Sequence, residues 1–170
     1  MKTKKRWQRY FITLLIFGIM ACQSLPQPTA LPNTNKASQL FKIEQQDSTA
    51  RLQQQSLLAL QYQPSQWRWV QTDPLGSPLA RVILTPQGWQ NDGFIMPNSQ
   101  AKWLFSAIAT ALYPNSPLFH FSAVKNVMGQ QEKQQIYFIN DKPVWTISGQ
   151  SPSWQIVLRD NSRWQVTELN

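Results

Sequence analysis

Short runs of alternating apolar and polar residues constrain the fold of this chain more than any other feature. The runs begin near residue 38 and continue to the C-terminus, and turn-forming residues such as Asn140-Asp141-Lys142-Pro143 separate them. Alternation with period two is typical of strands that bury one face. We predict strands at these sets: Leu40-Phe41-Lys42-Ile43; Leu58, Leu60 and Tyr62; Trp67 and Trp69; Ala80, Val82 and Leu84; Ile136 and Phe138; Trp145 and Ile147; Trp154, Ile156 and Leu158; Trp164 and Val166. The sequence therefore predicts a mainly β (α+β) domain with a meandering antiparallel sheet.

One segment breaks the alternation and favours a helix. Ser99 is a candidate cap for a helix over residues 100–113, and Pro114 would stop it. This helix is apolar on nearly all sides, so it must lie against the sheet or inside a curve of it. Because large sheets tend to curl, we expect a strongly curved sheet that forms an open half-barrel, with the helix covering a cavity. A core filled by its own side chains is the alternative, and the pattern fits both.

The N-terminus has the order of a secretion signal. The first ten residues hold five basic residues and no acid, and an apolar run of 11 residues, Phe11 to Ala21, follows with only Thr13 interrupting it. A membrane-spanning helix needs about 20 apolar residues, so a cleaved signal is the better interpretation.

The end of this signal, Ile19-Met20-Ala21-Cys22, resembles the lipobox of bacterial lipoproteins. The resemblance implies cleavage before Cys22 and acylation of Cys22, which anchors the protein to membrane lipid. Gln23 resembles the residue that directs export to the outer membrane, so we expect a lipid-anchored, periplasm-facing protein. An ordinary signal peptide with an incidental cysteine is the alternative. We divide the chain into a signal peptide (1–21), a flexible Pro-rich tether (22–37) and one domain (38–170).

Charge and size exclude some functional classes. Five of the sixteen Lys and Arg residues lie in the signal, so the rest of the chain has eleven against eight acids, without a clustered basic face. We therefore expect no nucleic-acid partner. The 149 residues after the signal suit one core, and we expect a monomer.

Catalytic and metal-binding patterns are missing from the sequence. His120 is the only histidine, and Ser122 lies two residues beyond it, but a hydrolase would also need an orienting carboxylate and an oxyanion hole. A surface or rim histidine is the simpler interpretation. One His and one acylated Cys do not make a zinc site. We expect a protein that is not an enzyme and has no cofactor or metal; an envelope hydrolase using His120 is the alternative.

The segment WRWVQTDPLGSPLARVILTPQGW, residues 67–89, resembles the LolB family of outer-membrane lipoprotein receptors. The chain is also similar to short outer-membrane lipoproteins whose genes often accompany aryl polyene and fatty-acid synthesis clusters. The LolB resemblance implies an open LolA/LolB-like half-barrel with an acyl-chain cavity. It also implies that Leu75, in the turn with Pro74 and Gly76, protrudes and promotes release of cargo into the membrane.

The rigidity of this turn gives the resemblance a physical basis. Pro74 fixes φ and Gly76 permits a positive φ, so Leu75 cannot fold back easily. A leucine that becomes fully buried in a bilayer interface gains about 1.5–3 kcal/mol. In the alternative, Leu75 packs on the rim of the barrel.

The expected function is to accept an acyl chain or acylated, lipid-like cargo, from a periplasmic carrier where one exists, and to pass it to the outer membrane. We expect these residues to line the cavity: Trp67, Trp69, Val82, Leu84, Trp103, Phe105 and Ile108. A structural or adaptor lipoprotein with a filled core, docking onto an envelope assembly, is the alternative.

Overall fold

The protein is built on a single antiparallel sheet of ten strands. The computed structural model describes residues 25–96, 98–116, 118–129 and 132–169. The strands are β1 (Ser38–Gln46), β2 (Leu52–Gln63), β3 (Gln66–Thr72), β4 (Pro78–Thr85), β5 (Gly88–Asn91), β6 (Ala123–Met128), β7 (Lys133–Ile139), β8 (Lys142–Gln150), β9 (Ser153–Leu158) and β10 (Arg163–Leu169). The prediction of a mainly β, antiparallel fold is confirmed.

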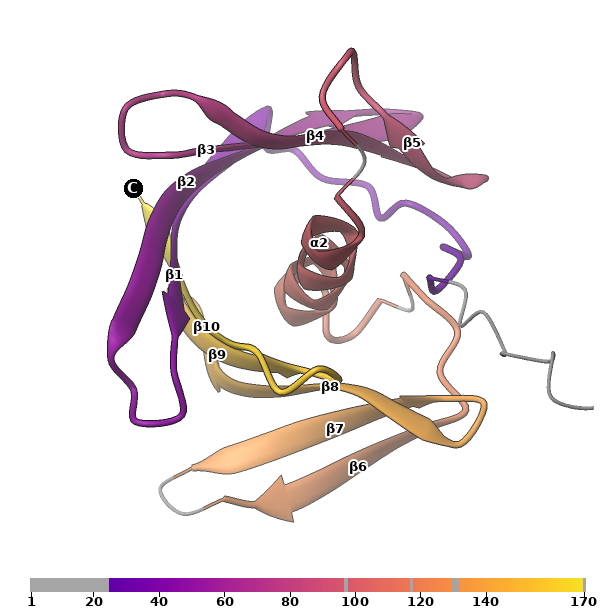
Figure 1. Cartoon of the computed structure of the whole chain (residues 1–170). Coiled ribbons are helices and arrows are strands. Elements are labelled where there is room, and N and C mark those ends of the chain that lie inside the picture. The colour runs from indigo at the N-terminus through magenta and orange to yellow at the C-terminus, as the bar shows by residue number, and fades with distance from the viewer. Residues whose placement is uncertain (1–24, 97, 117, 130–131, 170) are drawn as a thin grey trace, which may run out of the picture.

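The sheet consists of two five-stranded meanders that meet at its centre. Its strand order is β5-β4-β3-β2-β1-β10-β9-β8-β7-β6, so the first and last strands of the chain are neighbours. Ile43 on β1 faces Val166 on β10 in this central pairing, and both side chains are buried. The outer strands β5 and β6 do not pair with each other, so the strongly curved sheet stays open (Figure 1).

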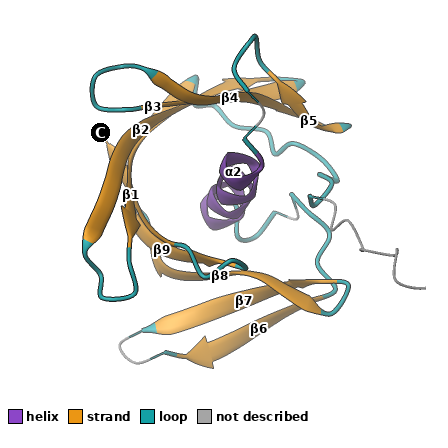
Figure 2. Ribbon diagram, in the orientation of Figure 1, coloured by secondary structure: helices purple, strands orange, loops and turns teal. Residues whose placement is uncertain are grey.

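One helix, α2 (Ser99–Leu112), lies on the concave side of the sheet (Figure 2). Asn98 caps it, because its side-chain oxygen accepts a hydrogen bond from the backbone N–H of Ala101 at 2.9 Å. We expected Ser99 to be the cap, so the predicted start was one residue late. The backbone N–H of Tyr113 donates to the carbonyl of Ala109 at the other end, and Pro114 follows. Within the described residues, no helix is long and apolar enough to cross a membrane.

Helix α2 is buried on nearly all sides, as its composition predicts. Its polar side chains are accommodated locally: Ser106 and Thr110 donate their hydroxyls to the carbonyls four residues earlier, at 2.8 and 2.9 Å. The indole N–H of Trp89 donates to the Ser106 hydroxyl at 3.1 Å. The helix can therefore enter the core without leaving these polar groups unpaired.

Stacked aromatic rings join α2 to the sheet. Phe105 on the helix stacks on Trp69 of β3 with ring centroids 5.3 Å apart and planes inclined by only 11°. Trp103 makes an edge contact with Trp145 of β8 at 6.2 Å. Because α2 contacts both meanders through large rings, it occupies the space that the curved sheet encloses.

Two parts of the second meander differ from the expected pattern. Strand β6 carries no alternating signal, because all but one of its residues are exposed. On β7 the buried side chain is Tyr137, which lies on the face opposite to Ile136 and Phe138. Alternation identified β7 as a strand but not which of its faces meets the core.

Part of the expected tether lies against the domain. The backbone N–H of Thr29 donates to the carbonyl of Leu118 at 2.8 Å, and Pro28 forms an isolated bridge with Phe119. Leu31 packs against the hydrophobic core. The flexible tether was predicted for residues 22–37, but residues 28–31 are held on the domain by these contacts.

The contact between α2 and the sheet gives the first prediction. Replacing Phe105 by Ala removes a side chain that is 0% exposed and leaves a cavity beside Trp69, so we expect a loss of about 3–5 kcal/mol in the free energy of unfolding. Urea unfolding followed by tryptophan fluorescence measures it. Leu57→Ala, at an exposed position of β2, is the control and should change stability by at most about 0.5 kcal/mol. Equal losses in the two variants would contradict the packing described here.

Candidate functional site

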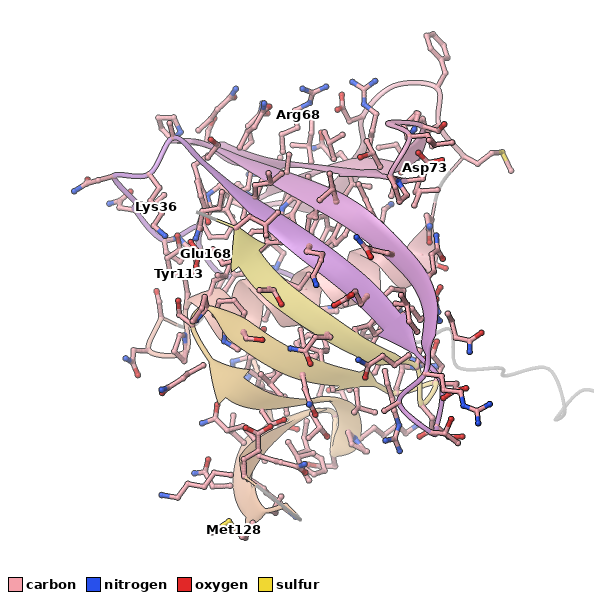
Figure 3. The ribbon with its side chains drawn as sticks, turned by 90° about the vertical axis from the view of Figure 1, so that its left-hand side faces the viewer. Lys36, Arg68, Asp73, Tyr113, Met128 and Glu168 are labelled. Atoms are coloured by element: carbon pink, nitrogen blue, oxygen red, sulfur yellow. The ribbon has the colours of Figure 1, made fainter. Side chains whose placement is uncertain are left out.

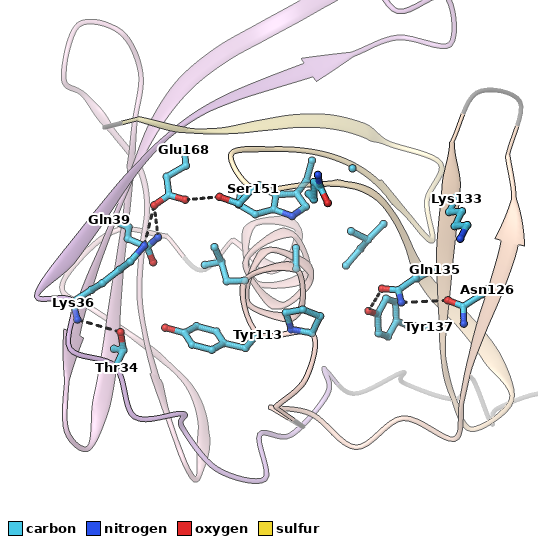
Figure 4. Close-up of a pocket in the computed structure, with 17 residues that line it drawn as sticks. Thr34, Lys36, Gln39, Tyr113, Asn126, Lys133, Gln135, Tyr137, Ser151 and Glu168 are labelled. Atoms are coloured by element: carbon cyan, nitrogen blue, oxygen red, sulfur yellow. Dashed lines mark hydrogen bonds and ion pairs between the residues drawn. The ribbon is translucent and has the colours of Figure 1, made fainter.

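A pocket of about 600 Å³ lies at the C-terminal end of α2, and we call it the helix-end pocket. Its walls come from the last residues of the helix, from β7, β8 and β9 on one side, and from residues 34–39 and β10 on the other (Figure 4). This volume is within the range of about 300–1,000 Å³ that is usual for small-molecule sites.

The inner part of the pocket is apolar. Ala111 and Leu112 contribute the end of the helix, while Ile147 and Trp154 contribute the concave face of the sheet. Ile147 and Trp154 are both buried members of the core. An alkyl group lying here would therefore touch the edge of the core, where hydrophobic contact is favourable.

One side of the pocket holds a hydrogen-bonded group that we call the Glu168 cluster: Lys36, Gln39, Ser151 and Glu168. The carboxylate of Glu168 accepts from the Lys36 ammonium at 3.1 Å, from the Gln39 amide at 2.6 Å and from the Ser151 hydroxyl at 3.4 Å (Figure 4). The side-chain oxygen of Gln39 accepts in turn from the Tyr62 hydroxyl. Three of the charged and polar groups on this wall are thus committed to Glu168.

The protonation states in this cluster follow from its contacts. Burial acts to raise the pKa of Glu168, but hydrogen bonds from Gln39 and Lys36 and the charge of Lys36 together bring that pKa below its ordinary value. Burial raises the pKa of the Tyr62 phenol, and its interaction with Tyr113 adds to this effect. Glu168 is therefore ionised near neutral pH, and Tyr62 keeps the proton that it donates to Gln39.

Strand β7 forms the opposite wall with alternate residues. Lys133, Gln135 and Tyr137 share its concave face, and all three line the pocket. The Tyr137 hydroxyl donates to the Gln135 side-chain oxygen at 2.8 Å, and the Gln135 amide donates to Asn126 of β6 at 3.2 Å (Figure 4). Along this wall the side chains change from the buried Tyr137 to the exposed Lys133.

The predicted lining residues lie elsewhere. The set of seven is part of the core or packs against it, and none of its members borders the helix-end pocket. Trp69, Val82, Leu84, Phe105 and Ile108 are at most 2% exposed. Of the other two, Trp67 borders a hollow of about 160 Å³ and Trp103 one of about 350 Å³. The rings at the middle of α2 were expected to face a cavity. Phe105 instead stacks on Trp69, Trp103 makes an edge contact with Trp145, and the pocket lies at the end of the helix.

The turn between β3 and β4 has the expected shape. The carboxylate of Asp73 accepts from the backbone N–H groups of Leu75 and Ser77 at 2.9 and 2.8 Å, and Gly76 has φ of +88°. Leu75 is 93% exposed, so it does not pack on the rim of the sheet. Asp73 and Pro74 hold this leucine in solvent on a tight turn.

Leu75 lies at the opposite end of the molecule from the helix-end pocket. Figure 3 shows Lys36, Tyr113 and Glu168 grouped at one end and Asp73 at the other. Strands β3 and β5 run in the same direction, so the loop after β5 emerges at the Asp73 end. That loop carries Phe94, which is fully exposed, and Met96, which is 83% exposed. We call the set Leu75, Phe94 and Met96 the apolar tips.

The remaining candidates for catalysis, His120 and Ser122, have no catalytic partners in the part of the chain that the structure describes. His120 is exposed, and the Ser122 hydroxyl accepts from the backbone N–H of Asp141 at 3.1 Å. Across the described ranges, no three His, Cys, Asp or Glu side chains come close enough to hold a metal ion. Cys22 and the signal lie outside the described residues.

The model of one protein family, described as "Protein of unknown function (DUF3261)", matches residues 36–167. The chain belongs to the DUF3261 family. No curated protein matches the chain. The DUF3261 match begins at Lys36, a pocket residue, and ends within β10, so it includes both meanders, α2 and nearly all of the pocket wall.

The residues of the helix-end pocket were not predicted, because they come from separate parts of the chain and are mostly polar. One local signal was present in β7, where Lys133, Gln135 and Tyr137 alternate with apolar Ile136 and Phe138. A polar face on a strand next to a buried helix indicates either solvent or a site, and the sequence does not distinguish these possibilities.

The ionisation of Glu168 gives the second prediction. A carboxylate whose pKa falls on folding stabilises the folded state above its ordinary pKa, and this contribution is lost as pH falls through the lower, folded value. Glu168→Gln should therefore destabilise the protein near pH 7, and the difference from wild type should shrink below about pH 4. Urea unfolding at both pH values measures the difference. Glu132→Gln removes one negative charge outside the cluster and is the control; a Glu168→Gln effect that is independent of pH would contradict the assignment.

Proposed function

We propose that this protein is a lipid-anchored, outer-membrane protein that binds an acyl chain or acylated cargo at the helix-end pocket and assists its transfer to the membrane. The observation that carries the proposal is the pocket itself, which combines an apolar floor at the edge of the core with polar walls. No catalytic arrangement accompanies the pocket in the described residues, so binding and release are the activities that the site supports best.

The floor of the pocket supports an alkyl ligand. Leu112, Ile147 and Trp154 offer apolar surface on two sides, and each methylene that they remove from water stabilises a complex by about 0.8 kcal/mol. A broader hollow of about 670 Å³ is lined by β1, β2, β10 and Lys36 and has no residue of α2. The helix-end pocket is the better candidate because the helix supplies a second apolar wall.

The apolar tips support contact with a membrane surface. Leu75, Phe94 and Met96 lie at one end of the molecule on two loops, and full burial of each contributes about 1.5–3 kcal/mol. Asp73 fixes the Leu75 turn, so little conformational entropy is lost when it inserts. Acylation at Cys22, expected from the lipobox, would keep the domain close to the bilayer.

The resemblance to the LolB family supports the same function. An exposed leucine on a rigid turn and an open, strongly curved sheet with a helix on its concave side agree with the half-barrel that this resemblance implies. Our proposal differs in the location of the ligand, because the residues at the middle of α2 are packed against the sheet.

The packed core also favours a second candidate, a structural or adaptor lipoprotein. Trp69 and Phe105 stack on each other and fill the space under the middle of α2. A domain with such a core is stable without a ligand and could present its surface to an envelope assembly. The experiments below separate this candidate from lipid binding.

Leu112→Arg gives the third prediction, a test of acyl binding. Arg at position 112 places a charge on the apolar floor, so labelling by a photoactivatable palmitate should fall at least about ten-fold, as loss of about 1.4 kcal/mol of binding energy would produce. The full chain in mild detergent is irradiated with the probe, and labelled peptides are mapped by mass spectrometry. We expect labels on peptides from the end of α2, β7 and β8.

Leu57→Arg is the matched control, since it makes the same exchange at an exposed position of β2 outside the pocket. It should keep wild-type labelling. If wild-type protein takes no label, or if both variants label as wild type does, the pocket does not bind acyl chains and the adaptor becomes the better candidate.

Leu75→Glu gives the fourth prediction, a test of membrane contact. The side chain is free in solvent, so the variant should fold normally and keep palmitate labelling, while delivery of a lipid probe into acceptor vesicles slows several-fold. Fluorescence transfer from loaded full-length protein to vesicles measures the rate. The matched control is Leu75→Met, which keeps an apolar tip and should transfer at the wild-type rate. Normal transfer by Leu75→Glu would remove the turn from the mechanism.

A further inference from the structure

Among the described residues, three charged side chains line the helix-end pocket, and their charges do not sum to zero. Lys36 and Glu168 form an ion pair at 3.1 Å and neutralise each other. Lys133 is the third, and it makes no ion pair among the residues that the structure describes. The pocket therefore has one positive charge in excess, at the outer end of the β7 wall.

The position of Lys133 gives the pocket a polarity along β7. Tyr137 is closest to the core, Gln135 follows, and Lys133 lies at the exposed end of the same face. The Tyr137 hydroxyl donates to Gln135 and the Gln135 amide donates to Asn126, so these side chains already have partners. An amphiphile with its tail on Leu112 and Ile147 would bring its head along this wall towards Lys133.

The end of α2 determines which lysine an anionic head would meet. A helix C-terminus carries about half a negative elementary charge, and the last turn of α2 holds no basic residue to offset it. The carboxylate of Glu168 lies on the Lys36 side. An anion is therefore disfavoured near the helix end and near Glu168, which leaves the Lys133 side as the favourable position.

Other charged groups of this hairpin do not compete for the position. Lys125 lies over the ring of Phe138, with its ammonium 5.0 Å from the ring centroid, and Phe138 is on the face of β7 opposite to Lys133. Glu132 stands in the bend just before β7, and it forms no ion pair with Lys133 among the described residues.

We propose that the helix-end pocket selects single-chain amphiphiles with an anionic oxygen-acid head, a carboxylate or a phosphate, and that Lys133 pairs with this head. The proposal rests on the proposed function, because it assumes that the alkyl tail occupies the apolar floor. It adds a specificity-determining residue and a class of ligand.

Native mass spectrometry of the full chain in mild detergent tests the proposal by internal competition. Palmitate and monopalmitoylglycerol, which share a tail but differ in head charge, are added in equimolar amounts. Wild type should favour palmitate, and Lys133→Gln should reduce the ratio of the two adducts about three-fold, as expected for one partly exposed ion pair. Lys142→Gln, an exposed lysine at the start of β8 that does not line the pocket, is the matched control and should keep the wild-type ratio.

A second mixture replaces palmitate by palmitoyl lysophosphatidate and distinguishes the two acids. A Lys133-dependent preference in either mixture supports the proposal and names the head that the site takes. If Lys133→Gln leaves both ratios unchanged while adducts still form, the anion selectivity is wrong and the proposed function stands. If no amphiphile forms an adduct with wild type, both are wrong.

Discussion

The structure depends on the burial of one helix that is apolar on nearly all sides. Helix α2 cannot face water on any long stretch of its surface, and a flat sheet would cover only one of its sides. The ten-stranded sheet curves around it, and residues such as Trp69 and Trp145 from the two meanders contact rings on the helix or its neighbours. The curvature of the sheet and the position of the helix are therefore one packing solution.

The pairing of β1 with β10 lets the sheet curve around the helix while its two edge strands, β5 and β6, stay unpaired with each other. Because the first and last strands meet at the centre, the chain leaves the sheet at β5, crosses through α2 and re-enters at β6, on the opposite edge. A 14-residue helix spans about 21 Å, and its last residues, Ala111 and Leu112, border the helix-end pocket. The helix-end pocket forms where the helix stops and the strands continue.

Strands that bury one face could be predicted from the sequence. Strands without a buried face could not. Trp154, Ile156 and Leu158 alternate because each meets the core, and the pattern identifies β9 without ambiguity. Strand β6 is exposed on both faces and stands at the edge, so nothing in its sequence records the pairing with β7. The cap of α2 was misplaced by one residue, since Asn98 and Ser99 are both good caps and only the backbone conformation selects one.

The candidate site was harder to predict than the fold, for a physical reason. Aromatic residues at the middle of a helix can line a cavity or fill it, and the outcome depends on whether their rings fit together. Phe105 and Trp69 fit nearly parallel, which removes the cavity there. Lys36, Lys133 and Glu168 are far apart in the chain, and only the pairing of β1 with β10 and the extension of β7 past the helix place them around one pocket.

The separation of the pocket from the apolar tips restricts how a transfer protein of this shape could work. Strand β3 has seven residues and is about 23 Å long, and the packed core lies between its two ends. A ligand at the helix end cannot slide through that core to the bilayer, so it must leave by the mouth through which it entered. If the apolar tips face the membrane, that mouth faces away from it and towards an incoming carrier. Release would then follow dissociation or a turn of the domain on its N-terminal segment. Because the two sites are distant, the free energy of ligand binding and the free energy of membrane contact are independent and add.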